Sequence, residues 1–98
     1  MSIPFPDPIT SAGNAEVKRL RSLHERKFRR QTGLFLAEGM RICTEAMALG
    51  WRLHRLAFLD GRGQDRMVRP LLEALARDGG RALPMTESLL SRISGKDN

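Results

Sequence analysis

Residues 26–39 read Arg-Lys-Phe-Arg-Arg-Gln-Thr-Gly-Leu-Phe-Leu-Ala-Glu-Gly, and within this stretch the chain changes from a basic surface to a buried core. Its cations Lys27, Arg29 and Arg30 lie too close together to be neutralised internally, so we expect them to face water. The unbroken apolar run at 34–37 is typical of a strand that is buried on both faces. Gly33 separates the two parts, and a helical pattern starts directly after the run. The stretch therefore predicts the first strand-to-helix unit of an α/β domain.

Helices and strands alternate along the rest of the chain. Asn14 is the expected cap of a first helix, which should break or bend between about residues 25 and 28. A second helix starts at Met40, with a buried stripe at Ile42, Cys43, Ala46 and Met47. Strands are predicted at 53–59 and 81–85, with a helix between them and a last helix capped by Thr86. We expect Phe28, Phe35 and Phe58 to be buried and Trp51 to cover the edge of the core. This order predicts a small, mainly parallel sheet between two helical layers.

The length of 98 residues allows one small domain with a single core. Three prolines within residues 4–8 exclude a helix there, so residues 1–13 are predicted to be a flexible lead-in. The domain itself is expected over residues 14–94, and residues 95–98 are expected to begin a linker. No apolar run approaches the ~20 residues that span a bilayer, and the amino terminus differs from a signal peptide. We therefore expect a cytoplasmic protein.

Positive charge is concentrated in one short segment. The chain carries a formal net charge of +6, and residues 14–30 contribute seven basic against two acidic side chains, 7 − 2 = +5. Such a segment can bind phosphates, an anionic membrane surface or an acidic protein. The chain lacks the large apolar face of an interfacial helix, so nucleic acid is the favoured partner.

Few residues suggest chemistry. Cys43 is the only cysteine and lies on an apolar helix face, which predicts an inert, buried thiol. His24 and His54 have no partner at metal-ligand spacing, and no phosphate-binding glycine motif is present. We therefore predict no catalytic, cofactor or metal site in this chain. Glu38 follows the first predicted strand without a nucleophile or base nearby, so a structural role at the junction with Gly39 is favoured over catalysis.

A spaced set of residues resembles a known family, the amino-terminal substrate-binding domain of SpoU/TrmH-type RNA ribose methyltransferases of the SPOUT superfamily. The set comprises Thr10, Ser11, Asn14, Lys18, Leu23, Lys27, Arg29, Gly33, Phe35, Glu38, Gly39, Glu45 and Ala46. The resemblance implies a three-layer α/β/α sandwich like that of ribosomal and kink-turn RNA-binding proteins. It also implies a parent enzyme that transfers a methyl group from S-adenosylmethionine to a ribose 2′-hydroxyl of ribosomal or transfer RNA. In this family a separate knotted domain binds the cofactor and forms the dimer.

The expected role of this chain is therefore RNA recognition without activity of its own, as a monomer. The predicted RNA-binding residues are Lys18, Arg19, Arg21, Arg26, Lys27, Arg29 and Arg30, which would contact the phosphate backbone. Base stacking is not expected, because the core should bury most of the aromatic side chains. Two alternatives remain open. One is a stand-alone kink-turn-type RNA-binding protein without an enzyme, and the other is a domain that chiefly contacts proteins.

Overall fold

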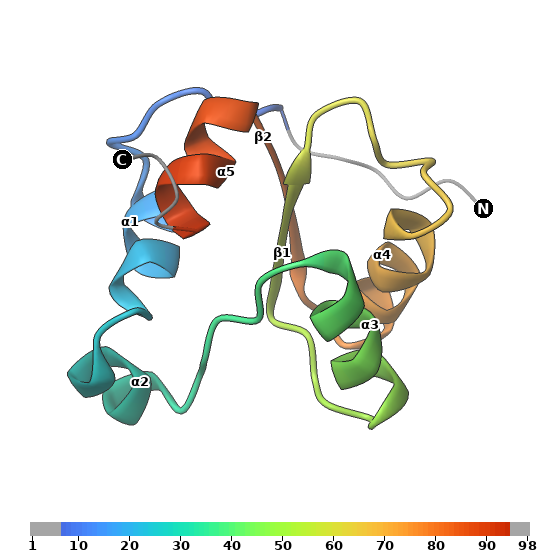
Figure 1. Cartoon of the computed structure of the whole chain (residues 1–98), viewed down its shortest axis with the longest axis horizontal. Coiled ribbons are helices and arrows are strands. Elements are labelled where there is room, and N and C mark those ends of the chain that lie inside the picture. Colours follow the sequence, from blue (N-terminus) through green and yellow to red (C-terminus); the bar gives the residue numbers. More distant parts are fainter. Residues whose placement is uncertain (1–6, 95–98) are drawn as a thin grey trace.

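Two parallel strands lie between two pairs of helices in the computed structural model, which describes residues 7–94 (Figure 1). The elements in chain order are α1 Ala15–Ser22, α2 Arg26–Thr32, α3 Met40–Ala48, β1 Arg55–Leu59, α4 Val68–Arg77, β2 Arg81–Met85 and α5 Glu87–Ser94. Helices α1 and α5 cover one face of the sheet, and α3 and α4 cover the other (Figure 1). The predicted three-layer α/β/α architecture is thus confirmed.

Alternation along the strands divides the core into two clusters. In β1, Leu56 and Phe58 face α4, and Ala82 of β2 joins them. In β2, Leu83 and Met85 face the opposite way and pack with α1 and α5. Strand β2 buries four of its five residues, and β1 buries two and half-buries two more, which suits a sheet with helices on both faces.

The strands pair in register from Arg55 with Arg81 to Leu59 with Met85. On the amino-terminal side of the domain, Ile9 forms a parallel bridge to Met85, and its backbone N–H donates to the carbonyl of Pro84 at 2.8 Å. Residues 1–6 and 95–98 lie outside the described residues, so the predicted mobility of the lead-in and the predicted linker stay predictions. Among residues 7–94, none of the helices has both the length and the apolar character needed to cross a bilayer.

The predicted strand at residues 34–37 is wrong. The structure assigns no strand there, and the sheet of the described residues consists of β1 and β2. The side chains of this segment divide between two sides of the molecule, since Leu36 packs with the α1–α5 cluster while Phe35 contacts Trp51. A segment that supplies apolar side chains to two separate places crosses the end of the core instead of joining the sheet.

Helix α3, which corresponds to the helix predicted to start at Met40, is also more exposed than predicted. Cys43 and Met47 pack against the core together with Met40, as their spacing of three and four residues requires. Ile42, by contrast, is 50 % exposed, because it lies on the outer side of α3. Trp51 is 53 % exposed and does not cover the core edge as expected.

The predicted break after the first helix is confirmed, although it comes about two residues earlier than expected. Asn14 caps α1 as predicted, because its side chain accepts a hydrogen bond from the backbone N–H of Glu16 at 2.8 Å. After Ser22 the backbone N–H groups of residues 23–25 each donate to the carbonyl three residues earlier, which forms a tighter turn that ends at Glu25. Leu23 is buried at this turn, and α2 starts again at Arg26.

Candidate nucleic-acid interface

Helix α2 displays three of its four cations on one side. At 100° per residue, Arg26, Lys27, Arg30 and Gln31 fall on a single face, and all four are exposed. Arg26 and Arg30 are one turn apart, where two like charges repel and weaken a helix. The helix holds no carboxylate and has no buried residue. We call Arg26, Lys27 and Arg30 the cationic face. None of these side chains is buried in the core, and the repulsion between their like charges destabilises the helix.

Local contacts on the inner side hold α2 in place. Gly33 closes it in the left-handed conformation at φ 72°, and its N–H donates to the carbonyl of Arg29 at 2.9 Å. The guanidinium of Arg29 points back toward the preceding turn and donates to the carbonyls of Leu23 at 3.0 Å and His24 at 2.9 Å. Arg29 thus fastens the turn between α1 and α2, while the cationic face points to solvent.

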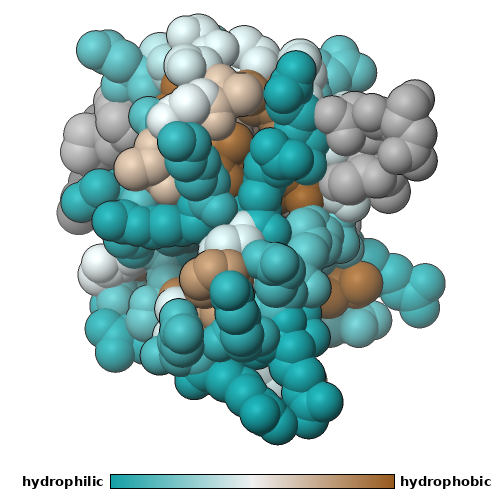
Figure 2. All heavy atoms as spheres, turned by 90° about the vertical axis from the view of Figure 1, so that its left-hand side faces the viewer, coloured by the Kyte–Doolittle hydropathy of each residue, from teal (hydrophilic) through white to brown (hydrophobic). Residues whose placement is uncertain are grey.

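Helix α1 adds further positive charge next to α2. Lys18 and Arg21 are exposed, as predicted for residues that contact RNA. Figure 2 looks onto the side that carries α1 and α2, and its lower part, where α2 lies, is mostly hydrophilic. Arg19 is also exposed, but its Nη1 donates to Oε1 of Glu16 at 2.8 Å. Among the described residues, Lys18, Arg21, Arg26 and Arg30 are therefore the predicted residues whose side chains face solvent without an internal contact, whereas Nζ of Lys27 lies 4.9 Å from the centroid of the Phe28 ring.

Glu16 is the one buried charged residue among those described, and it is neutralised twice. Its Oε2 accepts from Nε of Arg55 at 2.7 Å, in addition to the bond from Arg19. Burial by itself raises the pKa of this carboxyl, but the hydrogen bonds and charges of Arg55 and Arg19 outweigh it and hold the pKa below the ordinary value of 4.5. Glu16 is therefore ionised at neutral pH and serves the fold.

Other groups with chemical potential have structural surroundings. The ring of His24 hydrogen-bonds to the carbonyl of Ile93 through Nε2, which links the turn after α1 to the end of α5. Cys43 is half-buried, burial raises the pKa of its thiol, and Sγ lies 3.5 Å from the carbonyl oxygen of Ala37. A raised pKa leaves little reactive thiolate at neutral pH, as predicted. Within residues 7–94, no group of three or more His, Cys, Asp or Glu side chains could hold a metal ion.

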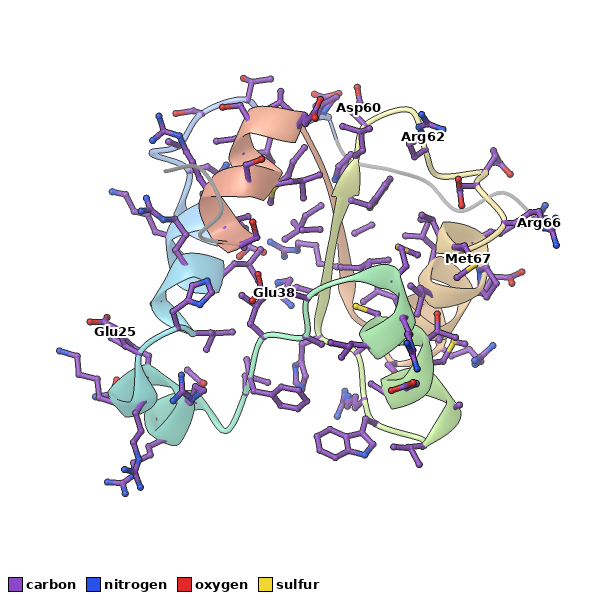
Figure 3. All side chains as sticks on the ribbon, viewed as in Figure 1. Glu25, Glu38, Asp60, Arg62, Arg66 and Met67 are labelled. Carbon is purple, nitrogen blue, oxygen red and sulfur yellow. The ribbon has the colours of Figure 1, made fainter. Side chains whose placement is uncertain are left out.

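The junction between residues 34–38 and α3 depends on Gly39, not on a bond from Glu38. Gly39 caps α3 at φ 96° and ψ 149°, a conformation that L side chains rarely adopt. Glu38 is exposed and lies near the centre of the view in Figure 3. The N-cap of the helix makes no side-chain hydrogen bond, and Glu38 does not cap the first amides of α3.

An exposed aromatic pair next to this junction was missed by the sequence prediction. The rings of Phe35 and Trp51 meet edge to face, with centroids 5.0 Å apart and planes at 87°. Both side chains also line a groove of about 870 Å³, together with residues of β1 such as Leu56. A signal was present, because Trp51 directly follows the glycine that ends α3 and precedes Arg52, a position more typical of a surface turn than of a core.

Comparison with known proteins shows the family to which this chain belongs. Two crystal structures of an rRNA methyltransferase from Sinorhizobium meliloti, the second with AdoMet bound, match 94 % of this chain at 30 % identity, with TM-scores of 0.80 and 0.79. The chain spans about a third of the length of these proteins, 33 % of each. No curated protein matches it. Residues 14–98 match the MRM3-like substrate binding domain over nearly the whole chain, so the chain belongs to that family of substrate-binding domains.

Proposed function

We propose that this chain is the RNA-recognition domain of an S-adenosylmethionine-dependent RNA 2′-O-ribose methyltransferase, with ribosomal RNA as the favoured substrate. The observation that carries the proposal is the cationic face of α2, which gathers three exposed cations on a helix that buries nothing. Evolved proteins accept such a local loss of stability where function requires it. Membership in a family of substrate-binding domains and the similarity to an rRNA methyltransferase support RNA as the ligand of that face.

The domain's share of the reaction is affinity and placement. Arginine and lysine side chains bind the phosphate backbone, fix the register of the RNA and carry no sequence information. The parent protein would bind S-adenosylmethionine and transfer the methyl group in a separate domain, as the family resemblance implies. We accordingly expect the isolated chain to be an inactive monomer and the parent to act in the cytoplasm as a dimer.

The test is the salt dependence of RNA binding by a double variant, Arg26→Gln with Arg30→Gln. Each backbone contact releases counterions, so each lost contact should flatten the slope of log affinity against log salt by about 0.7 on single-stranded RNA. We expect the double variant to bind many RNAs more weakly and to lose about 1.4 from the slope. Fluorescence anisotropy with labelled rRNA fragments at several salt concentrations measures both quantities.

The matched control is Arg66→Gln with Arg69→Gln, which removes the same charge elsewhere. Arg66 lies on the opposite side of the molecule from α2 (Figure 3), and both residues are exposed. This variant should keep the wild-type slope. Equal slopes in the two double variants, with both proteins folded, would mean that α2 does not contact the RNA and that the proposal is wrong.

A further inference from the structure

We propose that the Phe35–Trp51 pair is a stacking site for one unpaired nucleobase of the bound RNA, beside the phosphate contacts of α2. This inference rests on the proposed RNA-binding function and adds a second mode of contact to it. The ligand assigned to these two residues is a single-stranded nucleotide. Positive charge alone would not distinguish it from a nucleotide in a duplex.

Both aromatic side chains of the pair expose about half of their surface to solvent. Phe35 is 50 % exposed and Trp51 is 53 % exposed. An edge-to-face pair leaves the flat face of one ring turned away from its partner. Exposed aromatic surface of this kind marks interaction sites, and nucleobases stack on it with little dependence on sequence.

The backbone holds Trp51 rigidly. Helix α3 ends in a Schellman motif, in which the N–H of Gly50 donates to the carbonyl of Met47 and the N–H of Trp51 donates to that of Ala46, both at 3.0 Å. Gly50 takes the left-handed conformation that this motif requires, at φ 79°. Two residues after the tryptophan, the N–H of Leu53 donates to Oδ2 of Asp78 at 2.9 Å. A residue whose backbone is held on both sides loses little backbone entropy when a ligand binds its side chain.

The charges near the pair suit a nucleic acid. Arg52 follows Trp51 and is exposed, with Nη2 donating to the carbonyl of Asp78 at 3.1 Å. Arg30 of the cationic face precedes Phe35 by five residues, a distance of no more than about 18 Å along the chain. The exposed carboxylate of Glu45 on α3 is paired with Arg41 at 3.5 Å. One RNA strand can therefore bind α2 through its phosphates and place a base on the aromatic pair.

The groove next to the pair gives that base somewhere to lie. Its volume of about 870 Å³ falls in the range of small-molecule pockets, and most of its lining is apolar. A base stacked on Trp51 would enter this groove edgewise and exchange water for apolar contact. An RNA duplex does not expose a base in this way, so the site selects loops, bulges and ends.

The experiment uses the only tryptophan of the chain as its own probe. An oligouridylate strand is added to the full 98-residue chain while Trp51 fluorescence and the anisotropy of the labelled strand are both followed. We expect the fluorescence to be quenched in parallel with binding, and an abasic strand of equal length to bind more weakly without quenching. Trp51→Leu should lose about 5- to 150-fold in affinity at every salt concentration without a change of slope, whereas Trp51→Phe should retain most of it.

The outcomes separate this inference from the proposed function. Two results together would overturn the stacking site while the salt slope of α2 still supports RNA binding. These are wild-type affinity in Trp51→Leu, confirmed as folded by circular dichroism, and unquenched Trp51 fluorescence when the wild-type protein binds the strand. A fluorescence shift that depends on protein concentration without RNA would show that a second copy covers the pair, and would also overturn it. No binding by any strand would refute both proposals.

Discussion

Oε2 of Glu16 accepts a hydrogen bond from Nε of Arg55 at 2.7 Å, and this contact joins the first turn of α1 to the first residue of β1. The carboxylate side chain is only 11 % exposed and is shared with Arg19. Two cations on one buried carboxylate fix how α1 lies against the sheet. Because α1 leads directly into the turn that carries α2, the same contact positions the cationic face.

Glu16→Gln should destabilise the domain by about 1–3 kcal/mol, because it replaces two charge-assisted hydrogen bonds with weaker ones. A change of this size lowers Tm by roughly 5–20 °C in a domain of this length. The control is Glu45→Gln, which breaks the exposed pair with Arg41 at 3.5 Å and should cost less than about 0.5 kcal/mol. Thermal melts followed by circular dichroism measure both losses of stability. Equal losses would mean that the buried pair stabilises the domain no more than the exposed pair does.

The same carboxylate predicts an acid-sensitive step in stability. The pKa of Glu16 is lowered in the folded protein, so its contribution is fully present above the unfolded value of 4.5 and is lost as pH falls through the lower folded pKa. The difference in Tm between wild type and Glu16→Gln should therefore be constant from about pH 7 to pH 5 and shrink below that. Melts of both proteins at pH 7, 5, 4 and 3 test this. A gap that stays constant down to pH 3 would contradict the assignment.

Sequence patterns were sufficient where one physical requirement decided the outcome. Asn14 and Thr86 cap their helices because short polar side chains reach the first amides, and strand 81–85 is buried because both its faces meet helices. The segment 34–37 could not be placed in this way. Its apolar run satisfies a buried strand and a crossing segment equally well. Contacts with distant residues decide between them, namely the packing of Leu36 with the α1–α5 cluster and the contact of Phe35 with Trp51.

The candidate site shows the same limit. The sign and density of charge at residues 26–30 identified the basic segment, because no fold provides internal partners for so many adjacent cations. Which cation supports the turn and which faces outward depends on helix phase and on where the break falls. The break came earlier than expected, and this shift turned Arg29 inward to the carbonyls of the preceding turn.

Gly39→Ala should destabilise the fold, while Glu38→Gln should not. An added Cβ at Gly39 meets no atom within 4 Å, so the cost is backbone strain alone, about 1–3 kcal/mol at φ 96°. Glu38 is exposed and makes no cap to α3, so its substitution should change stability by less than about 0.5 kcal/mol. Urea unfolding of both variants gives the comparison. If Glu38→Gln keeps its stability but loses RNA affinity, Glu38 contacts the substrate and its structural assignment is wrong.

Arg29 and Arg30 are adjacent and equally charged, yet substitution to Gln should have different effects at the two positions. Arg29→Gln removes two hydrogen bonds to the carbonyls of Leu23 and His24, so we expect a loss of about 1–2 kcal/mol in stability and a loosened α2. Arg30→Gln removes a solvent-facing charge and a repulsion with Arg26, so stability should stay the same or rise slightly. The two variants should also differ in RNA binding. Arg30→Gln should flatten the slope of log affinity against log salt by about 0.7, whereas Arg29→Gln should lower the affinity with a smaller change in slope. Chemical unfolding and salt-dependent anisotropy on the same two proteins measure both effects. Identical behaviour of the two variants in both assays would contradict the division of α2 into an inner anchoring side and an outer binding face.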